Sequence, residues 1–327
     1  MDLVLVFMAL MGLSVLVYVV LDGYDLGVGM LMPAASGEEQ STMVSSIGPF
    51  WDANETWLVL GIGILLAAFP GALAFVLGGL YLPVVAMLVG LMLRGVAFEL
   101  RMKAHGWHRE LWNWLFWAGS FLASFCQGLM LGRYVTGFHG GFGYWLFAIV
   151  VGGSLCGGYV LLGATWLILK TEGALQRKAV AWARWGLLWV ALGVGLVSLA
   201  TPLVSETVRE RWFDFPRTLW VMALPLATVA AGAWLWHGTR AVERGGGRDA
   251  QPFTAAALIF VLAFAGLAYS IFPYIVIDRL TIWEAAAHPS ALKALFVGAA
   301  IVLPFIAGYT VMSYRIFGGK ARAGLYD

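Results

Sequence analysis

Charged residues are scarce in this sequence, and their shortage excludes an ordinary soluble protein. Only 12% of the 327 residues are Asp, Glu, Lys or Arg, whereas 61% are hydrophobic, and the mean hydropathy is +0.85. A soluble domain has about a quarter of its residues charged. The 20 basic and 18 acidic residues nearly balance, which gives no concentrated basic stripe for nucleic acid. The composition therefore indicates an integral membrane protein that does not bind nucleic acid.

Cysteine and histidine are also scarce, which limits the metal and haem chemistry available to this chain. Cys126 and Cys156 lie in apolar runs, so we expect two small buried hydrophobic residues rather than a disulfide or a thiolate metal site. A b-type haem inside a helical bundle needs inward-facing axial ligands. The histidines all fall in expected connections or at the ends of apolar runs: His105, His108, His139, His237 and His288. We therefore expect this chain to bind no haem and no metal.

Long apolar runs dominate what is present. A transmembrane helix needs about 20 mostly apolar residues, and nine such segments can be counted: 3–32, 50–69, 72–98, 112–135, 144–169, 181–201, 218–236, 253–273 and 291–317. The first run is too long for a signal peptide and has no basic segment before it, so it should remain as a helix. Only Pro70 and Gly71 separate the second and third, which predicts a tight turn there. The predicted fold class is an all-α integral membrane protein with about nine transmembrane helices in a single polytopic membrane domain, 1–327.

The distribution of lysine and arginine predicts the orientation in the membrane. With nine spans, one side carries the larger set of basic residues, namely Arg101, Lys103, Arg109, Lys170, Arg177, Lys178, Arg184, Arg240, Arg244, Arg248, Arg315, Lys320 and Arg322. The other side carries Arg133, Arg209, Arg211, Arg217, Arg279 and Lys293. Because the more basic side is usually cytoplasmic, we expect the N-terminus outside and the C-terminus in the cytoplasm.

Charged residues inside the spans are the candidate functional residues, because a charge at membrane depth is expensive and is usually paired or functional. They come from three consecutive spans: Asp22 and Asp25, then Asp52 and Glu55, then Arg94 and Glu99. Each of the first two pairs has a spacing of three residues, which places its members on one helical face. At about 1.5 Å per residue, Asp22 lies roughly 28 Å from Leu3, towards the cytoplasmic edge. All six side chains are therefore expected at one depth.

Structural explanations exist for five of these six charges. Asp52 and Glu55 follow Pro49 at a helix start, where acidic side chains cap free amides. Arg94 fits a snorkelling arginine, with Asp22 and Asp25 as its ion-pair partners. However, one arginine cannot neutralise so many acids. The excess of buried carboxylates favours proton exchange, and hence a proton entry site.

Three motifs resemble a known family. They are DGYDLGVG (22–29), PFWDANETW (49–57), and FPY (272–274) followed by LTIWEAA (280–286). Together with the span count and orientation, they resemble subunit II of the cytochrome bd quinol oxidase family over most of the chain. Relatives more often have glycine at Ala53, valine at Thr56 and aspartate at Glu284.

The resemblance implies an architecture and a role. It implies two four-helix bundles, 1–140 and 141–275, and a peripheral helix, 290–320. It implies a non-haem subunit of a quinol:oxygen oxidoreductase in the bacterial cytoplasmic (inner) membrane, with haems b and d, or b only, in a haem-bearing partner subunit I. Asp25 and Asp52 would be the cytoplasmic proton pathway, and Asp22, Glu55, Arg94 and Glu99 join them on geometry alone. A small single-helix accessory subunit, and a quinone or phospholipid bound to this subunit, are left open.

A second interpretation from the same residues is an independent secondary transporter with a carboxylate ion site. Such transporters usually have helix-breaking glycine or proline at the membrane midplane in paired halves. The glycines inside these spans show no such pairing. The sequence therefore favours the oxidase subunit.

Overall fold

The computed structural model describes residues 2–215 and 217–321, and helices account for almost all of them. The long helices are α1 (Leu3–Leu31), α3 (Trp51–Ala68), α4 (Pro70–Lys103), α5 (Trp107–Val135), α6 (Phe142–Lys170), α7 (Gly173–Val204), α9 (Arg217–Glu243), α10 (Ala250–Ile271) and α12 (Pro289–Ile316). The short elements are a 3-10 helix η1 (Met32–Ala34), α2 (Gly37–Ile47), α8 (Glu206–Phe213), α11 (Ile282–Ala285), and the strands β1 (Tyr274–Val276) and β2 (Leu280–Thr281). The predicted all-helical class is confirmed.

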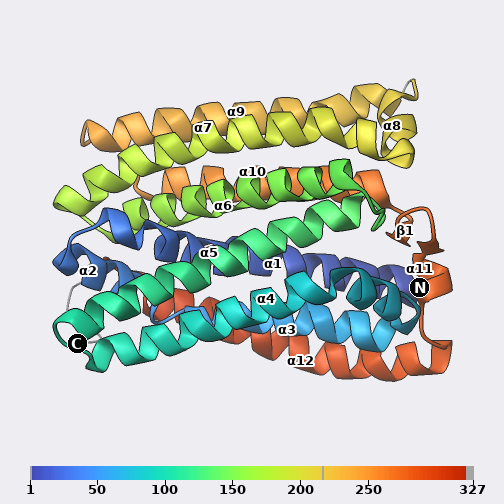
Figure 1. Cartoon of the computed structure of the whole chain (residues 1–327), viewed down its shortest axis with the longest axis horizontal. Coiled ribbons are helices and arrows are strands. Elements are labelled where there is room, and N and C mark those ends of the chain that lie inside the picture. Colours follow the sequence, from blue (N-terminus) through green and yellow to red (C-terminus); the bar gives the residue numbers. More distant parts are fainter. Residues whose placement is uncertain (1, 216, 322–327) are drawn as a thin grey trace.

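Within the described residues, eight helices are long and apolar enough to cross a membrane. The predicted segment 50–69 forms α3, which is not one of them, because its first two turns carry Asp52, Asn54 and Glu55. The count of nine spans is thus not confirmed, although α3 runs alongside the others (Figure 1). The turn before α4 also lies one residue earlier than predicted. Pro70 begins α4, a position at which proline loses no helical hydrogen bond.

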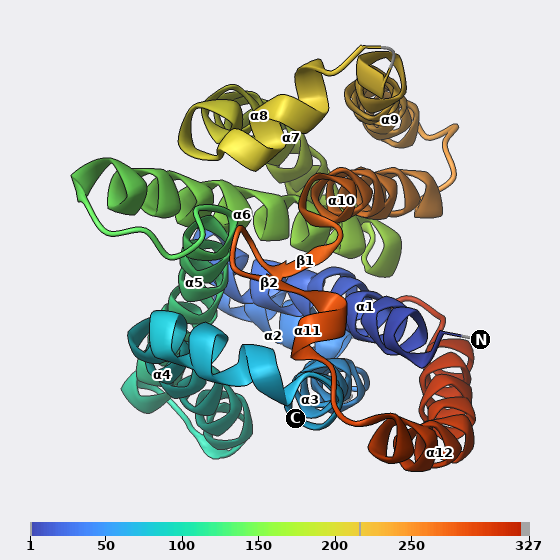
Figure 2. The same ribbon diagram turned by 90° about the vertical axis from the view of Figure 1, so that its right-hand side faces the viewer.

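The long helices lie roughly along one axis and alternate in direction, so α1 begins and α12 ends at opposite ends of the molecule (Figure 1). At one edge α7 and α9 lie together, and at the other α3 lies between α4 and α12 (Figure 2). The division into bundles 1–140 and 141–275 stays a prediction, since α1 and α6 pack along each other across that boundary. A Cβ on Gly27 would lie 1.8 Å from the carbonyl oxygen of Tyr159, so only glycine permits this approach.

The two ends of the molecule are closed by different short elements. At one end lies α2, which the sequence patterns did not predict, and which begins with a capping box between Ser36 and Glu39. At the other end lies the short helix α8, Glu206–Phe213. There α11 begins with a second capping box, in which Glu284 accepts from the backbone of Thr281. Glu284 therefore has a structural role. Its side chain is long enough to reach back from the third helical position to the N-cap amide.

Candidate functional site

The candidate site lies where α1, α3 and α4 converge, towards the end of the molecule that carries α2. Helix α1 contributes Asp22 and Asp25, α3 contributes Asn54 and Glu55, and α4 contributes Arg94. Asp22 lies roughly 28 Å along α1 from Leu3. Asp22, Asp25, Asn54 and Arg94 are all buried. Three helices therefore bring charged and polar groups together inside an apolar core.

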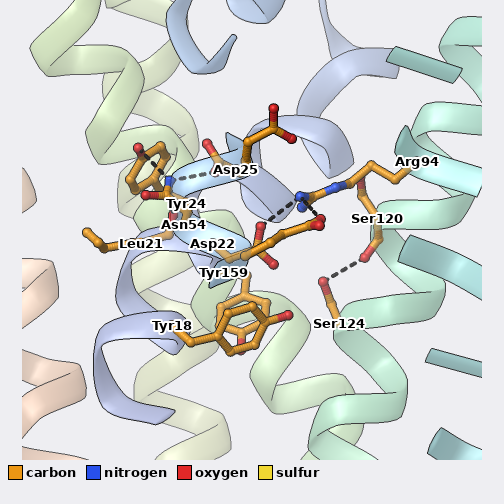
Figure 3. A network of polar contacts seen from close by, with 12 residues as sticks. Tyr18, Leu21, Asp22, Tyr24, Asp25, Asn54, Arg94, Ser120, Ser124 and Tyr159 are labelled. Atoms are coloured by element: carbon orange, nitrogen blue, oxygen red, sulfur yellow. Dashed lines mark hydrogen bonds and ion pairs between the residues drawn. The ribbon is translucent and has the colours of Figure 1, made fainter. Parts of the chain in front are cut away.

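Arg94 is shared between two carboxylates. Its Nη2 atom lies 2.7 Å from Asp22 Oδ1 and 2.7 Å from Glu55 Oε1. The Arg94 and Asp22 side chains are 2% and 0% exposed, whereas that of Glu55 is 31% exposed. Figure 3 shows Arg94 reaching Asp22 from the side of α4. Because the guanidinium carries one charge and stays protonated, the Asp22, Glu55 and Arg94 triad is net negative when both acids are ionised.

Asp25 lies beside this triad and is held differently. Its Oδ2 atom accepts a hydrogen bond from the amide of Asn54 at 2.8 Å. Among the described residues, its Oδ1 atom has no hydrogen-bond partner although it is buried. The narrow space next to it, also lined by Trp51, Phe98 and Arg94, leaves no room for a water molecule. Asp25 is thus a buried carboxyl group with a neutral donor on one oxygen.

Asp52 and Glu99 do not join the cluster. Both side chains are exposed on this chain. Glu99 follows Arg94 by five residues and so lies about 140° around α4 from it, while Asp52 lies about 160° around α3 from Asn54. The predicted meeting of five carboxylates therefore reduces to three, because common depth does not ensure a common direction.

Uncharged residues of the site were missed by sequence reasoning. Asn54 lies inside the second motif, but a single amide carries no charge signal. Tyr24 and Tyr314 contact Asn54 from α1 and α12, and they are 290 residues apart in the chain. On the other side of Asp22, Gln127 donates to Tyr18 and accepts from Tyr159. No spacing rule relates residues so far apart.

The histidines of this chain do not suit haem ligation. All five are exposed, in connections or near helix ends. Within residues 2–215 and 217–321, no group of three or more His, Cys, Asp or Glu side chains is placed to hold a metal ion. Cys126 and Cys156 are free and buried, as predicted. The residues present do not fit a b-type haem held by inward histidines.

These features define a polytopic helical membrane protein with a buried carboxylate and arginine cluster near one end of its helices. Comparison with known proteins identifies the family. The family model for cytochrome bd terminal oxidase subunit II matches residues 3–317, so the chain belongs to this family.

Named relatives agree with this assignment. The chain is 28% identical to cytochrome bd ubiquinol oxidase subunit 2 of Bacillus subtilis, with 91% of this chain and 90% of that protein covered. It is 28% identical to cytochrome bd-I ubiquinol oxidase subunit 2 of Escherichia coli K12, with 94% and 93% covered. A chain of the bd oxidase structure from Geobacillus thermodenitrificans superposes with a TM-score of 0.74 at 19% identity, covering 98% of this chain and 100% of that one, and supports the fold.

Proposed function

We propose that this chain is the haem-free subunit of a membrane-embedded quinol oxidase, and that it supplies protons from the cytoplasm to the oxygen-reducing centre of the partner subunit I. Quinol oxidation and oxygen reduction then take place in the partner. The observation that carries the proton role is the burial of Asp25 beside a triad that already contains two acids and one arginine. Family membership favours this over the transporter interpretation.

Asp25 is the proposed proton carrier within the cluster. Asp22 and Glu55 both contact Arg94 directly, at 2.7 Å, and this pairing favours two fixed charges. Among the described residues, the side chain of Asp25 instead has the neutral amide of Asn54 as its hydrogen-bond partner. Protonation of Asp22 or Glu55 would weaken an ion pair with Arg94, whereas protonation of Asp25 breaks no direct ion pair. The proton therefore resides on Asp25.

The exposed face of α3 supports the assignment of a partner. Asp52 and Glu55 lie in a stripe that continues through Val59, Ile62 and Leu66, spaced at three and four residues along one side of the helix. Acids on such a face are unfavourable against lipid. We propose that subunit I covers this stripe, and that Asp52 is the entry point between the two subunits. Glu99 would lie near this entrance on α4.

The orientation and location follow from the same proposal. The end of the molecule with α2 carries most of the lysines and arginines, and basic connections are usually cytoplasmic. Protons would therefore enter from the cytoplasm. The N-terminus would lie outside the bacterial inner membrane.

The test is Asp25→Asn in the intact heterodimer, because asparagine keeps the size of the side chain but cannot ionise. We expect assembly and the haem absorption spectrum to be retained. Oxidase turnover should fall by on the order of tenfold or more, most strongly at high pH, where hydronium is scarce. Glu206→Gln, an exposed acid in α8 at the opposite end, is the matched control and should keep normal turnover. Normal turnover in Asp25→Asn at every pH would refute the proton role.

A further inference from the structure

Three side chains next to Asp25 form a closed ring of hydrogen bonds. Asn54 Nδ2 donates to the Tyr24 hydroxyl at 2.9 Å, and the Tyr24 and Tyr314 hydroxyls lie 2.5 Å apart. The Tyr314 hydroxyl donates to Asn54 Oδ1 at 3.1 Å. The ring therefore starts and ends on one amide group.

Counting hydrogens fixes the direction of every bond in this ring. A tyrosine hydroxyl has one hydrogen, and that of Tyr314 is used on Asn54. Tyr24 must then donate to Tyr314, while it accepts from Asn54. Each of the two hydroxyls thus both donates and accepts, so the ring is fully satisfied.

The ring leaves one Asn54 hydrogen for Asp25. An amide nitrogen has two hydrogens, and three acceptors lie within reach: Tyr24 at 2.9 Å, Asp25 Oδ2 at 2.8 Å and the Leu21 carbonyl at 3.2 Å. The two shorter contacts take the two hydrogens. If the amide turned over, its oxygen would face the carboxylate of Asp25 and the hydroxyl of Tyr24. The ring therefore keeps a donor, not an acceptor, against Asp25 (Figure 3).

Aromatic stacking holds both tyrosines in place. Tyr24 stacks on Trp166 with ring centroids 4.0 Å apart, and Tyr314 stacks on Phe50 at 4.6 Å. Tyr24 and Asn54 are fully buried. These contacts leave the hydroxyl positions little freedom, and they make the amide orientation depend on the last long helix, α12.

We propose that Tyr24 and Tyr314 act through Asn54 as positioning residues for proton exchange at Asp25. This inference rests on the proposed function, in which Asp25 carries the proton. With Oδ2 held by the amide, Oδ1 is the oxygen that takes up and releases the proton. Helix α12 thereby sets the geometry of an acid on α1.

The experiment is a double-mutant cycle in the intact oxidase, with turnover measured at pH 8. Tyr314→Phe removes one hydroxyl and keeps the ring stacked on Phe50. We expect turnover to fall roughly two- to tenfold, the size of one lost hydrogen bond, with unchanged haem spectrum and assembly. Tyr309→Phe, an exposed tyrosine on the same helix, should have no effect. In the Asp25→Asn background, Tyr314→Phe should cause no further loss, because there is no proton left to position.

The possible results separate the two proposals. If Asp25→Asn lowers turnover but Tyr314→Phe does not, or if the two losses multiply, the positioning role is overturned and the proton role stands. If Asp25→Asn has no effect, both are overturned. Tyr24→Phe breaks the same ring at another point and should repeat the pattern, which guards against a folding defect specific to one variant.

Discussion

Arg94 offers the most direct measure of what the buried cluster contributes to stability. Replacing it with methionine keeps much of the side-chain volume but leaves Asp22, which is fully buried, without a positive partner. Removing one member of a buried ion pair typically costs about 3 to 5 kcal/mol. Glu55 adds less to the loss, because its side chain is 31% exposed and water can solvate it. We therefore expect Arg94→Met to lower the free energy of unfolding by about 3 to 5 kcal/mol.

The second half of this prediction concerns a double variant, in which the added substitution should raise the free energy of unfolding instead of lowering it. Adding Asp22→Asn to Arg94→Met removes the unpaired buried charge. The double variant should therefore be more stable than Arg94→Met alone, since neutral replacements of a buried pair are often tolerated. The assay is denaturant unfolding of the purified complex in detergent, followed by tryptophan fluorescence. Arg209→Met, which breaks an exposed pair with Glu206, is the control and should cost about 1 kcal/mol or less.

This reasoning would be refuted if Asp22→Asn lowered the free energy of unfolding by the same amount in the Arg94→Met background as it does in the otherwise unchanged protein. Additive losses would mean that the two side chains do not interact in the folded protein. The cluster would then contribute through packing alone.

Three further outcomes are expected. Expressed without its partner, the chain should show no Soret absorption, and a stoichiometric haem band would contradict the haem-free role. Gly27→Ala should destabilise the protein by about 1 to 3 kcal/mol in thermal unfolding, because its Cβ would collide with the backbone of Tyr159 on α6; Gly195→Ala on α7, with open space around it, is the control. The hydrogen bond from Lys178, together with the Ser36 backbone, lowers the pKa of Glu39 below its usual 4.5. Its stabilisation of α2 is thus present above pH 4.5 and is lost as the pH falls through the lowered pKa. Amide hydrogen exchange should show this as smaller protection factors in α2 at low pH, once the slower intrinsic exchange there is taken into account.

The sequence predicted the fold class, because apolar runs of about 20 residues have few alternatives to a membrane helix. It also indicated the depth of the charged residues, since rise per residue converts directly into distance along a helix. The amphipathic helix α2 and the hairpin of β1 and β2 were not predicted. Helix α2 is short and polar, and the two strands have only three and two residues, so neither element has a hydropathy signal that separates it from a connection.

Side-chain direction was decided only by tertiary structure. Asp25 and Asp52 look equivalent in sequence, as acids near the same end of consecutive helices. The packing of α1 against α3 and α6 buries Asp25, whereas Asp52 faces outwards from this chain. Which face of a helix is covered depends on the neighbouring helices. When every face of a helix is apolar, its local sequence pattern does not specify which helices these are.

The sequence alone determined that this protein is helical, membrane-embedded and without inward histidines, because composition and hydropathy act on each segment independently of the others. Only the tertiary structure decided that Arg94 pairs with Asp22 and Glu55, and that Tyr314 closes a ring on Asn54. These contacts join residues 39 to 260 positions apart. Their geometry follows from how the whole set of helices packs, so no single segment contains the information.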